Sequence, residues 1–254
     1  MRRRRVLIVG GGCYGGHFAH SLARARRRGG ESFDLWIVDR NENCPAGVEI
    51  DGDADRVVVA EWSVFLGSYL GGAAPERARR GRDLLVPSPL APHLFADWLA
   101  SRWEERPVDS IPFPISPELP YQKELLDGGR AISHADWLCP IHCIEPRLCP
   151  ATRQLRDWEL ARSLLSLARR LRQIESAPCV GPLLAQCVHW REGVGVMVLG
   201  DWLVAAERAQ RALGGGAGTV LAATTSSCHG VAHLLRIGEL PPRGGGAPNA
   251  VGLP

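Results

Sequence analysis

The sequence lacks a long hydrophobic run. No stretch of its 254 residues approaches the roughly 20 consecutive apolar residues that a helix needs to cross a bilayer. The opening MRRRRVLIVGGG has the charged start of a signal peptide, but its apolar run covers only residues 6–9 before glycines interrupt it. The sequence therefore predicts neither a membrane span nor export, and we expect a cytoplasmic protein.

The chain also lacks a strong charge of one sign. Lysine occurs once, at Lys123, and arginine supplies the rest of the 30 basic residues. Because 27 acidic residues oppose them, the formal net charge is only +3. A nucleic-acid-binding surface is expected to carry a clear basic excess. We therefore expect no specific nucleic-acid partner, and we interpret the arginine clusters as solvated helix faces.

Eight cysteines and 29 glycines stand out in an otherwise ordinary globular composition, with 45% hydrophobic and 22% charged residues. In a reducing compartment, cysteines are more often free thiols or metal ligands than partners in structural disulfides. The length is sufficient for one large α/β domain or two small ones. The positions of the glycines and cysteines therefore have to be examined separately.

The glycines at the start of the chain have the spacing of a dinucleotide-binding turn. VLIVGGGCYGGHFAHSLARA has an aliphatic run, then Gly10, Gly12 and Gly15, then apolar residues at helical spacing. In a G-x-G-x-x-G loop the first glycine makes a tight turn, the second lets the backbone approach a pyrophosphate, and the third lets helix and strand pack closely. Cys13 and Tyr14, inside this loop, are included in the predicted cofactor site.

A second predicted strand, DLWIVD at residues 34–39, ends in an acid. Asp39 is placed to accept hydrogen bonds from an adenosine ribose, as expected in a βαβ dinucleotide-binding unit. Arg40 follows it and could contact a 2′-phosphate, whereas Asp39 would repel one. We therefore favour NAD over NADP as the cofactor, and a dinucleotide fold without a ligand is the alternative.

Residues 5–100 resemble the nucleotide-binding domain of the TrkA and RCK family of potassium-transport regulators. The resemblance rests on VGGGCYGGHFAHSLA and DLWIVDRNE, together with a short third strand. It implies a Rossmann-like fold, a doubly wound and mostly parallel sheet, with nucleotide bound at the glycine loop. Nothing after residue 100 resembles the ligand-binding second domain of that family, so the resemblance does not imply channel gating.

Residues 106–150 form a segment rich in proline and cysteine. The density of proline excludes a long helix and disfavours a central strand, so we expect an ordered, extended insertion. Cys139, Cys143 and Cys149 follow a C-x3-C-x5-C spacing that matches neither common zinc pairs nor the bacterial ferredoxin run. Thiolates in a stiff loop suit a soft metal, so we predict zinc or an iron-sulfur cluster.

Cys228 is the predicted fourth ligand. It follows a buried run at Val220–Ala223, and we expect a helix to begin near His229, so Cys228 would lie where a strand ends and a helix dipole stabilises a thiolate. His142, His229 and Cys13 are the alternatives. Cys228 and His229 could instead act as nucleophile and base. For Cys44, Cys179 and Cys187 we expect ordinary burial as small hydrophobic side chains.

The rest of the chain is predicted to be α/β as well. An amphipathic helix is expected within residues 153–174, then a strand, a helix capped by Asp201, and a further strand. We expect residues 1–105 to be the dinucleotide-binding half, 106–150 the insertion, 151–240 an extension of the same parallel sheet, and 241–254 a disordered tail.

Together these patterns predict an NAD(P)-dependent oxidoreductase with a metal or iron-sulfur site beside the nucleotide. Pairing with a nicotinamide favours iron-sulfur over zinc. The alternative is a non-catalytic, redox-sensing regulator braced by a structural zinc. A small-molecule substrate or a redox partner is expected in the first case. The reaction, the substrate and the oligomeric state, a homodimer included, are left open.

Overall fold

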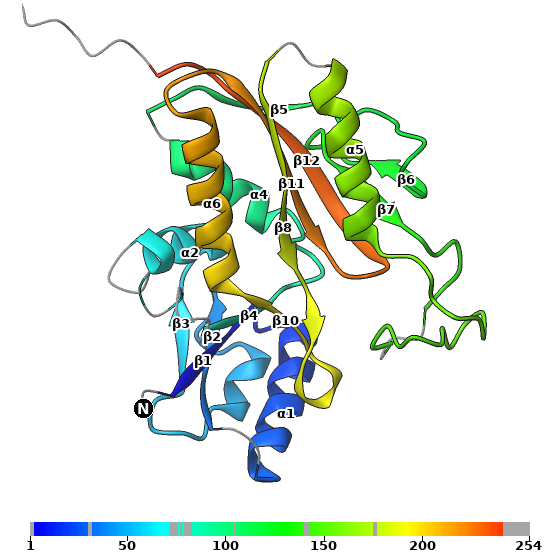
Figure 1. The fold of residues 1–254 in the computed structure, drawn as a ribbon. Helices are drawn as coiled ribbons and strands as arrows, with labels where there is room; N and C mark the ends of the chain where they lie inside the picture. The colour runs from blue at the N-terminus through cyan, green and yellow to red at the C-terminus, as the bar shows by residue number, and fades with distance from the viewer. Residues whose placement is uncertain are drawn as a thin grey trace, which may run out of the picture.

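Two β-sheets with helices packed on their faces make up the protein (Figure 1). The structure is a computed structural model and describes residues 3–29, 32–71, 76, 78, 83–103, 105–139, 143–174 and 177–240. The predicted tail, residues 241–254, lies outside the described residues. Both sheets are mixed, and the fold belongs to the α/β class.

The first sheet has the strand order β3-β2-β1-β4-β10-β9. Four of its strands are mutually parallel: β1 (Arg4–Val9), β2 (Phe33–Asp39), β3 (Arg56–Val59) and β4 (Leu84–Val86). The remaining two come from far along the chain and are antiparallel to their neighbours: β9 (Val188–His189) and β10 (Gly195–Val198). The amino-terminal sheet is therefore completed by residues more than 100 positions later.

The second sheet has the order β6-β7-β12-β11-β8, and β5 also pairs with β12. Its strands are β5 (Val108–Ile111), β6 (Tyr121–Glu124), β7 (Arg130–Ser133), β8 (Cys179–Gln186), β11 (Gly218–Thr225) and β12 (His229–Ile237). Only β8 and β11 are parallel to each other, so their carboxyl ends lie at the same edge. β11 and β12 form a long antiparallel hairpin.

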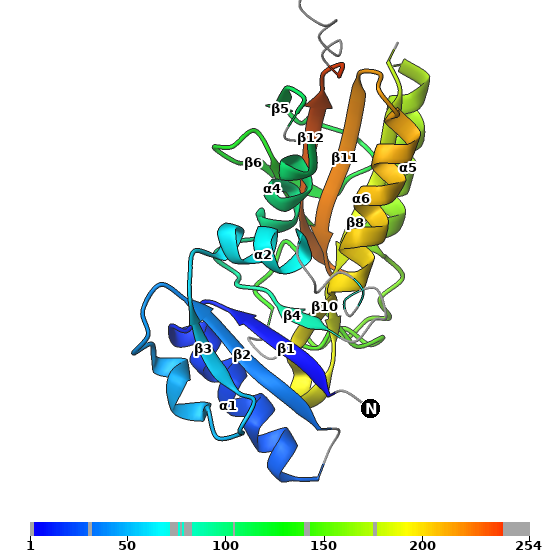
Figure 2. The same cartoon turned by 90° about the vertical axis from the view of Figure 1, so that its left-hand side faces the viewer.

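Helices cover both faces of both sheets (Figure 2). They are α1 (Cys13–Arg27), α2 (Trp62–Gly71), α4 (Leu94–Ala100), α5 (Leu160–Ile174) and α6 (Leu199–Leu213), with short 3-10 helices at Pro45–Glu49, Ser101–Trp103 and Arg191–Gly193. Alternate residues of a strand point to opposite faces. In β1, Val6 and Ile8 pack in the core under α1, whereas Leu7 and Val9 face α2.

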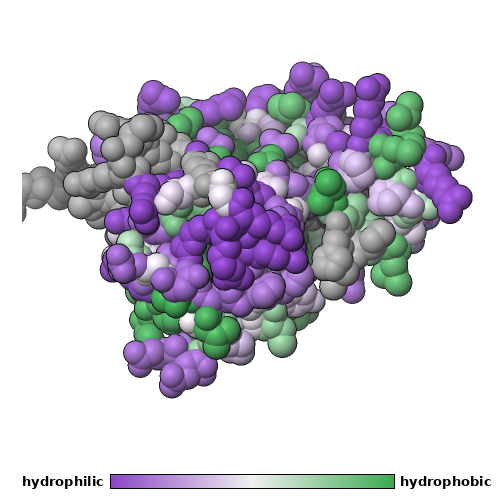
Figure 3. Space-filling view, turned by 90° about the horizontal axis from the view of Figure 1, so that it is seen from below, coloured by the Kyte–Doolittle hydropathy of each residue, from purple (hydrophilic) through white to green (hydrophobic). Residues whose placement is uncertain are grey.

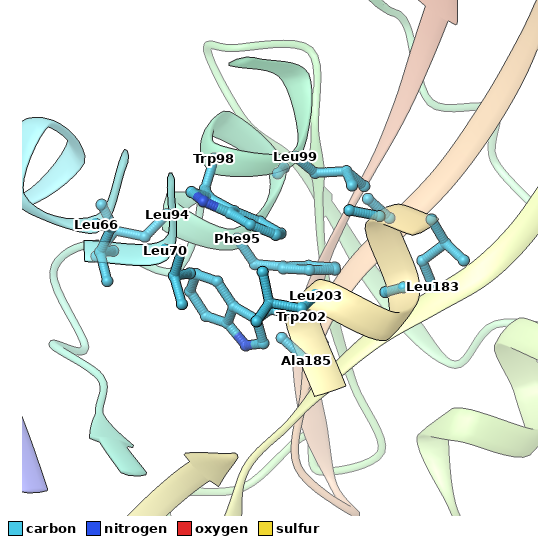
Figure 4. Packing of buried hydrophobic residues seen from close by; sticks show 14 of the residues in the cluster. Leu66, Leu70, Leu94, Phe95, Trp98, Leu99, Leu183, Ala185, Trp202 and Leu203 are labelled. Carbon is cyan, nitrogen blue, oxygen red and sulfur yellow. The ribbon is translucent and has the colours of Figure 1, made fainter. Parts of the chain in front are cut away.

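The largest core joins the two sheets. It contains Leu7 of the first sheet and Leu183 of the second, together with Phe95 of α4 and Trp202 of α6. The Phe95 and Trp202 rings meet edge to face, with centroids 5.1 Å apart, and Trp98 packs beside them (Figure 4). A separate core lies between α5 and the other face of the second sheet.

Several predictions about architecture are wrong. The carboxyl-terminal part does not extend one parallel sheet, because β8, β11 and β12 form the second sheet and β10 joins the first one antiparallel. The segment 106–150 is not a strandless insertion. It supplies β5, β6 and β7, and the prolines that the structure describes in it lie outside these strands, where no ladder hydrogen bond is lost. Asp201 does not cap α6 but lies within its first turn.

The surface near α1 is mostly hydrophilic, as the view from below shows (Figure 3). The arginines at the end of α1 have acidic partners: Arg24 and Arg28 pair with Glu192, and Arg26 pairs with Asp55. The carboxylates therefore balance this basic cluster. Within the described ranges, no helix combines the length and apolar character needed to span a bilayer.

Candidate functional site

The glycine loop connects β1 to α1, and each glycine meets a different steric demand. Gly10 has a φ of +84°, a left-handed conformation that suits glycine. A Cβ on Gly15 would lie 1.7 Å from the Gly10 carbonyl oxygen. A Cβ on Gly12 would meet nothing within 4 Å. The loop is therefore tightly packed at its first and third glycines and open at its second.

Cys13 and Tyr14 begin α1, and both are exposed. The first turn of α1 contains no acidic residue, and no side chain caps its first amide groups. These amide groups form the positive end of the helix dipole. This helix start can therefore accept an anionic group.

Asp39 turns toward the glycine loop. Its Oδ2 accepts a hydrogen bond from the Gly11 amide at 2.6 Å, and its Oδ1 accepts one from the Asn41 amide at 2.8 Å. A carboxylate has about four lone-pair sites, so further acceptor positions remain. Arg40 is exposed and pairs with Glu61, with 2.5 Å between Nε and Oε1. Asp39 thus lies beside the glycine loop, and Arg40 is paired with the carboxylate of Glu61.

A separate cavity of about 200 Å³ lies where β8 and β11 end. Cys139, Cys143 and Cys149 line it together with Cys228, which is in the turn between β11 and β12. The structure thus brings together thiols that are separated by about 80 residues of chain. All eight cysteines are free. His142 lies outside the described residues.

Nitrogen atoms face each of the four sulfur atoms. The Trp158 indole N–H donates to Cys228 Sγ at 3.3 Å, and the Glu145 amide donates to Cys143 Sγ at 3.4 Å. His229 Nε2 lies 3.8 Å from Cys139 Sγ. At Cys149 the amide and hydroxyl of Thr152, and then the Ala151 amide, lower the pKa of the thiol. N–H groups directed at sulfur stabilise the thiolate form.

The helix predicted at His229 is wrong. These residues form β12, which pairs with β11 on one side and with β7 and β5 on the other. Pairing on both sides favours a strand over the helix that we expected from the Ser-Ser-Cys sequence. Cys228 therefore does not precede the helix that we expected, although the first amide of α5, at Leu160, donates to the Ser227 carbonyl oxygen. Burial, the largest cause, raises the pKa of its thiol to about 11.

Cys228 and His229 have different hydrogen-bond partners in the structure. Their side chains leave the chain in different directions, as expected for neighbours at the start of a strand. Cys228 Sγ meets the Trp158 indole, whereas His229 Nδ1 meets Ser133 Oγ at 2.8 Å and its Nε2 faces Cys139. Both residues line the same cavity. The histidine is thus a partner of Cys139.

No group of three or more His, Cys, Asp or Glu side chains, among the residues that the structure describes, is close enough to hold a single metal ion. The four cysteines line the cavity together with eight other residues.

Three lining residues were missed by the sequence analysis. Glu145 is between Cys143 and Cys149, and its carboxylate reaches the turn that carries Cys228. Trp158 and Arg156 precede α5 and close another side of the cavity. An acid within a cysteine segment was the only available signal for Glu145. Nothing in the sequence placed residues 156–158 beside Cys228.

The glycine loop and the cysteine cavity are not in direct contact in the described structure. The cavity lining includes none of Gly10, Gly12, Gly15, Asp39 or Arg40. An indirect connection runs through the β9–β10 hairpin. Glu192 in it pairs with Arg24 of α1, and a Cβ on neighbouring Gly193 would lie 3.0 Å from Ile144. The hairpin thus contacts the end of α1 and lies near Ile144 of the cysteine segment.

The family model described as AF_1314_C, "Uncharacterized protein, C-terminal domain", matches residues 94–238, more than half of the chain. The chain belongs to the AF_1314_C family. Its matched region begins with α4 and ends with β12, so it contains the complete lining of the cysteine cavity and excludes the glycine loop. No curated protein and no solved structure matches the chain.

As expected, Cys44 and Cys179 are buried in apolar surroundings. Cys187 is only partly buried, although it packs against the largest core. Burial, followed by the charge of Glu145, raises the pKa of the Cys187 thiol to about 12. These three cysteines do not line the cavity.

Proposed function

We propose that this protein is an NAD(P)-binding oxidoreductase whose cysteine cavity holds an iron-sulfur cluster. One observation carries the proposal: Cys139, Cys143, Cys149 and Cys228 line a single cavity although two distant segments supply them. Cysteine thiolates are the usual ligands of such clusters. When bound, a cluster transfers single electrons, whereas a nicotinamide carries hydride.

The residues around the sulfur atoms suit a cluster. Reduction potentials of iron-sulfur clusters depend on hydrogen bonds to sulfur and on solvent exposure. The Trp158 indole and the amide of Glu145 supply such hydrogen bonds. Arg156 adds a cation that favours the thiolate of Cys228, and tryptophan and proline side chains line the cavity. The chain's own residues would therefore orient the ligands and offset part of their charge.

The amino-terminal sheet supports the nucleotide part of the proposal. Its parallel strands have the order β3-β2-β1-β4, which is half of the Rossmann arrangement, with helices on both faces. The glycine turn after β1 and Asp39 at the end of β2 support a Rossmann-like assignment of this half. NAD is favoured because Asp39 would repel a 2′-phosphate.

Anaerobic purification tests the occupant of the cavity. We expect a brown protein that contains iron and acid-labile sulfide, and we expect Cys149→Ser and Cys228→Ser each to lose most of both. Cys13→Ser is the matched control, because its thiol is exposed and outside the cavity. A colourless protein with one zinc ion would instead support the regulator braced by zinc. Metal-free protein after reconstitution would contradict both.

Titration with NADH tests the glycine loop. A valine at Gly12 projects into space that no other residue fills, so Gly12→Val should leave the fold intact and obstruct a pyrophosphate. We expect affinity to fall at least about tenfold, or ~1.4 kcal/mol. Gly67→Ala, also open to solvent but within α2, is the control. Equal affinity of Gly12→Val and wild type would contradict dinucleotide binding at this loop.

A further inference from the structure

Glu145 joins the cysteine segment to the turn that carries Cys228. Its Oε1 accepts hydrogen bonds from Ser226 Oγ at 2.5 Å and from the Cys228 amide at 3.2 Å. Its Oε2 accepts one from the Ser227 amide at 2.9 Å. The partners are more than 80 residues away along the chain. One carboxylate therefore ties together the two segments that supply the thiols.

The backbone of Glu145 is specialised for the same task. Its φ is +48°, a left-handed conformation that residues with a side chain rarely adopt. In this conformation its amide donates to Cys143 Sγ, while its carboxylate reaches the β11–β12 turn. Strained backbone persists only where the surrounding structure holds it, and it concentrates at functional sites. Main chain and side chain of this residue thus contact both sides of the cavity.

The carboxylate is a positioning group and not itself a ligand. Three donors from the turn already occupy its oxygen atoms. These contacts bind the side-chain and amide donors of the turn between β11 and β12, whereas the amides of Leu160 and His134 bind the carbonyl oxygens of Ser227 and Cys228. Trp158 fixes the Cys228 sulfur from the opposite side. The position of Cys228 therefore depends on a residue from the cysteine segment.

We propose that Glu145 is the positioning residue that holds Cys228 against the cysteine segment, so that the fourth thiol is in place before the cavity is filled. The identity of the occupant rests on the proposed function, but the positioning does not. Loss of the carboxylate should free the turn and expose Cys228. It should also lower the occupancy of the site to the level found in Cys228→Ser.

Alkylation of the metal-free protein by iodoacetamide, followed residue by residue with mass spectrometry, tests the positioning. Glu145→Ala should speed the reaction of Cys228 about tenfold, the effect of losing charge-assisted hydrogen bonds. Cys179, buried in the α5 core, is the internal control for unfolding. Glu145→Gln should restore part of the protection, because its amide oxygen still accepts hydrogen bonds. Glu118→Ala, which removes a carboxylate outside the cavity, should change neither rate.

The outcomes separate the two proposals. Faster alkylation of Cys228 in Glu145→Ala than in Glu145→Gln, which lacks the same charge, with unchanged Cys179, supports the positioning role, whether or not wild type takes up iron. Unchanged Cys228, or an equal rise at Cys179, overturns it. If wild type forms a cluster, Glu145→Ala should contain as little iron and sulfide as Cys228→Ser, and full occupancy would contradict the role. If wild type takes up no metal while Cys228 is released in Glu145→Ala, the proposed function fails and the positioning stands.

Discussion

At the scale of single residues, the cysteines divide by environment. Cys187 is outside the cavity lining and partly buried against the largest core, and burial followed by the charge of Glu145 raises the pKa of its thiol. A neutral thiol is favoured where burial and a negative charge act together. Cys187 should therefore react slowly with alkylating reagents. Its ionisation at alkaline pH should lower the stability of the folded protein.

Cys187 should weaken the folded state at high pH. Its folded pKa is raised from 9.0 to about 12, so between these values the folded protein keeps a proton that the unfolded chain has released. Its contribution to the free energy of unfolding is complete below pH 9 and falls by ~1.4 kcal/mol per pH unit above it. Urea unfolding of metal-free wild type and Cys187→Ala at several pH values measures this. Parallel pH dependences for the two proteins would refute it.

At the scale of elements, α6 connects β10 of the first sheet to β11 of the second. Trp202 on this helix is 1% exposed and packs against Phe95 and Trp98 of α4. The side chains of α6 therefore pack in the core that joins the two sheets.

Trp202→Ala should cost about 3–5 kcal/mol, because it leaves a large cavity in the shared core. Chemical denaturation followed by far-UV circular dichroism measures the loss. Trp190→Ala is the comparison, since Trp190 is only partly buried against the smaller core under α1. An equal loss in the free energy of unfolding for the two substitutions would show that the packing between α4 and α6 stabilises the protein no more than the smaller core does.

Elements with a strong local pattern could be predicted from the sequence. The run VLIV, the glycine turn and the following helix agree with β1 and α1, and Val220–Ala223 lies within β11. The β12 strand was not predicted; it pairs with the neighbouring β11 on one edge and with residues from 108–133 on the other. The gathering of the cysteines was expected from thiol chemistry. Its partners Glu145 and Trp158 were not, because contacts across about 70 or more residues leave no local pattern.

At the scale of the whole molecule, one hydrophobic core serves both sheets. The chain also passes from the second sheet to the first and back through β8, β10 and β11. Each sheet therefore contains strands whose neighbours along the chain belong to the other sheet.

The two sheets should unfold in one cooperative step. Shared packing makes the stability of each part depend on the other. In urea we expect the transitions seen by tryptophan fluorescence and by far-UV circular dichroism to coincide. Trp202→Ala should shift both midpoints together. Two separated transitions would show that each sheet is stable alone.

The late position of β10 has a consequence for synthesis on the ribosome. β1 to β4 leave the exit tunnel early, but the edge of β4 stays without its partner until residues 195–198 have been made. At about 5–20 residues per second, the wait is on the order of 5–20 seconds. An unpaired edge strand is a site of association with other chains. Nascent chains of this protein should therefore depend on chaperones until the β9–β10 hairpin emerges.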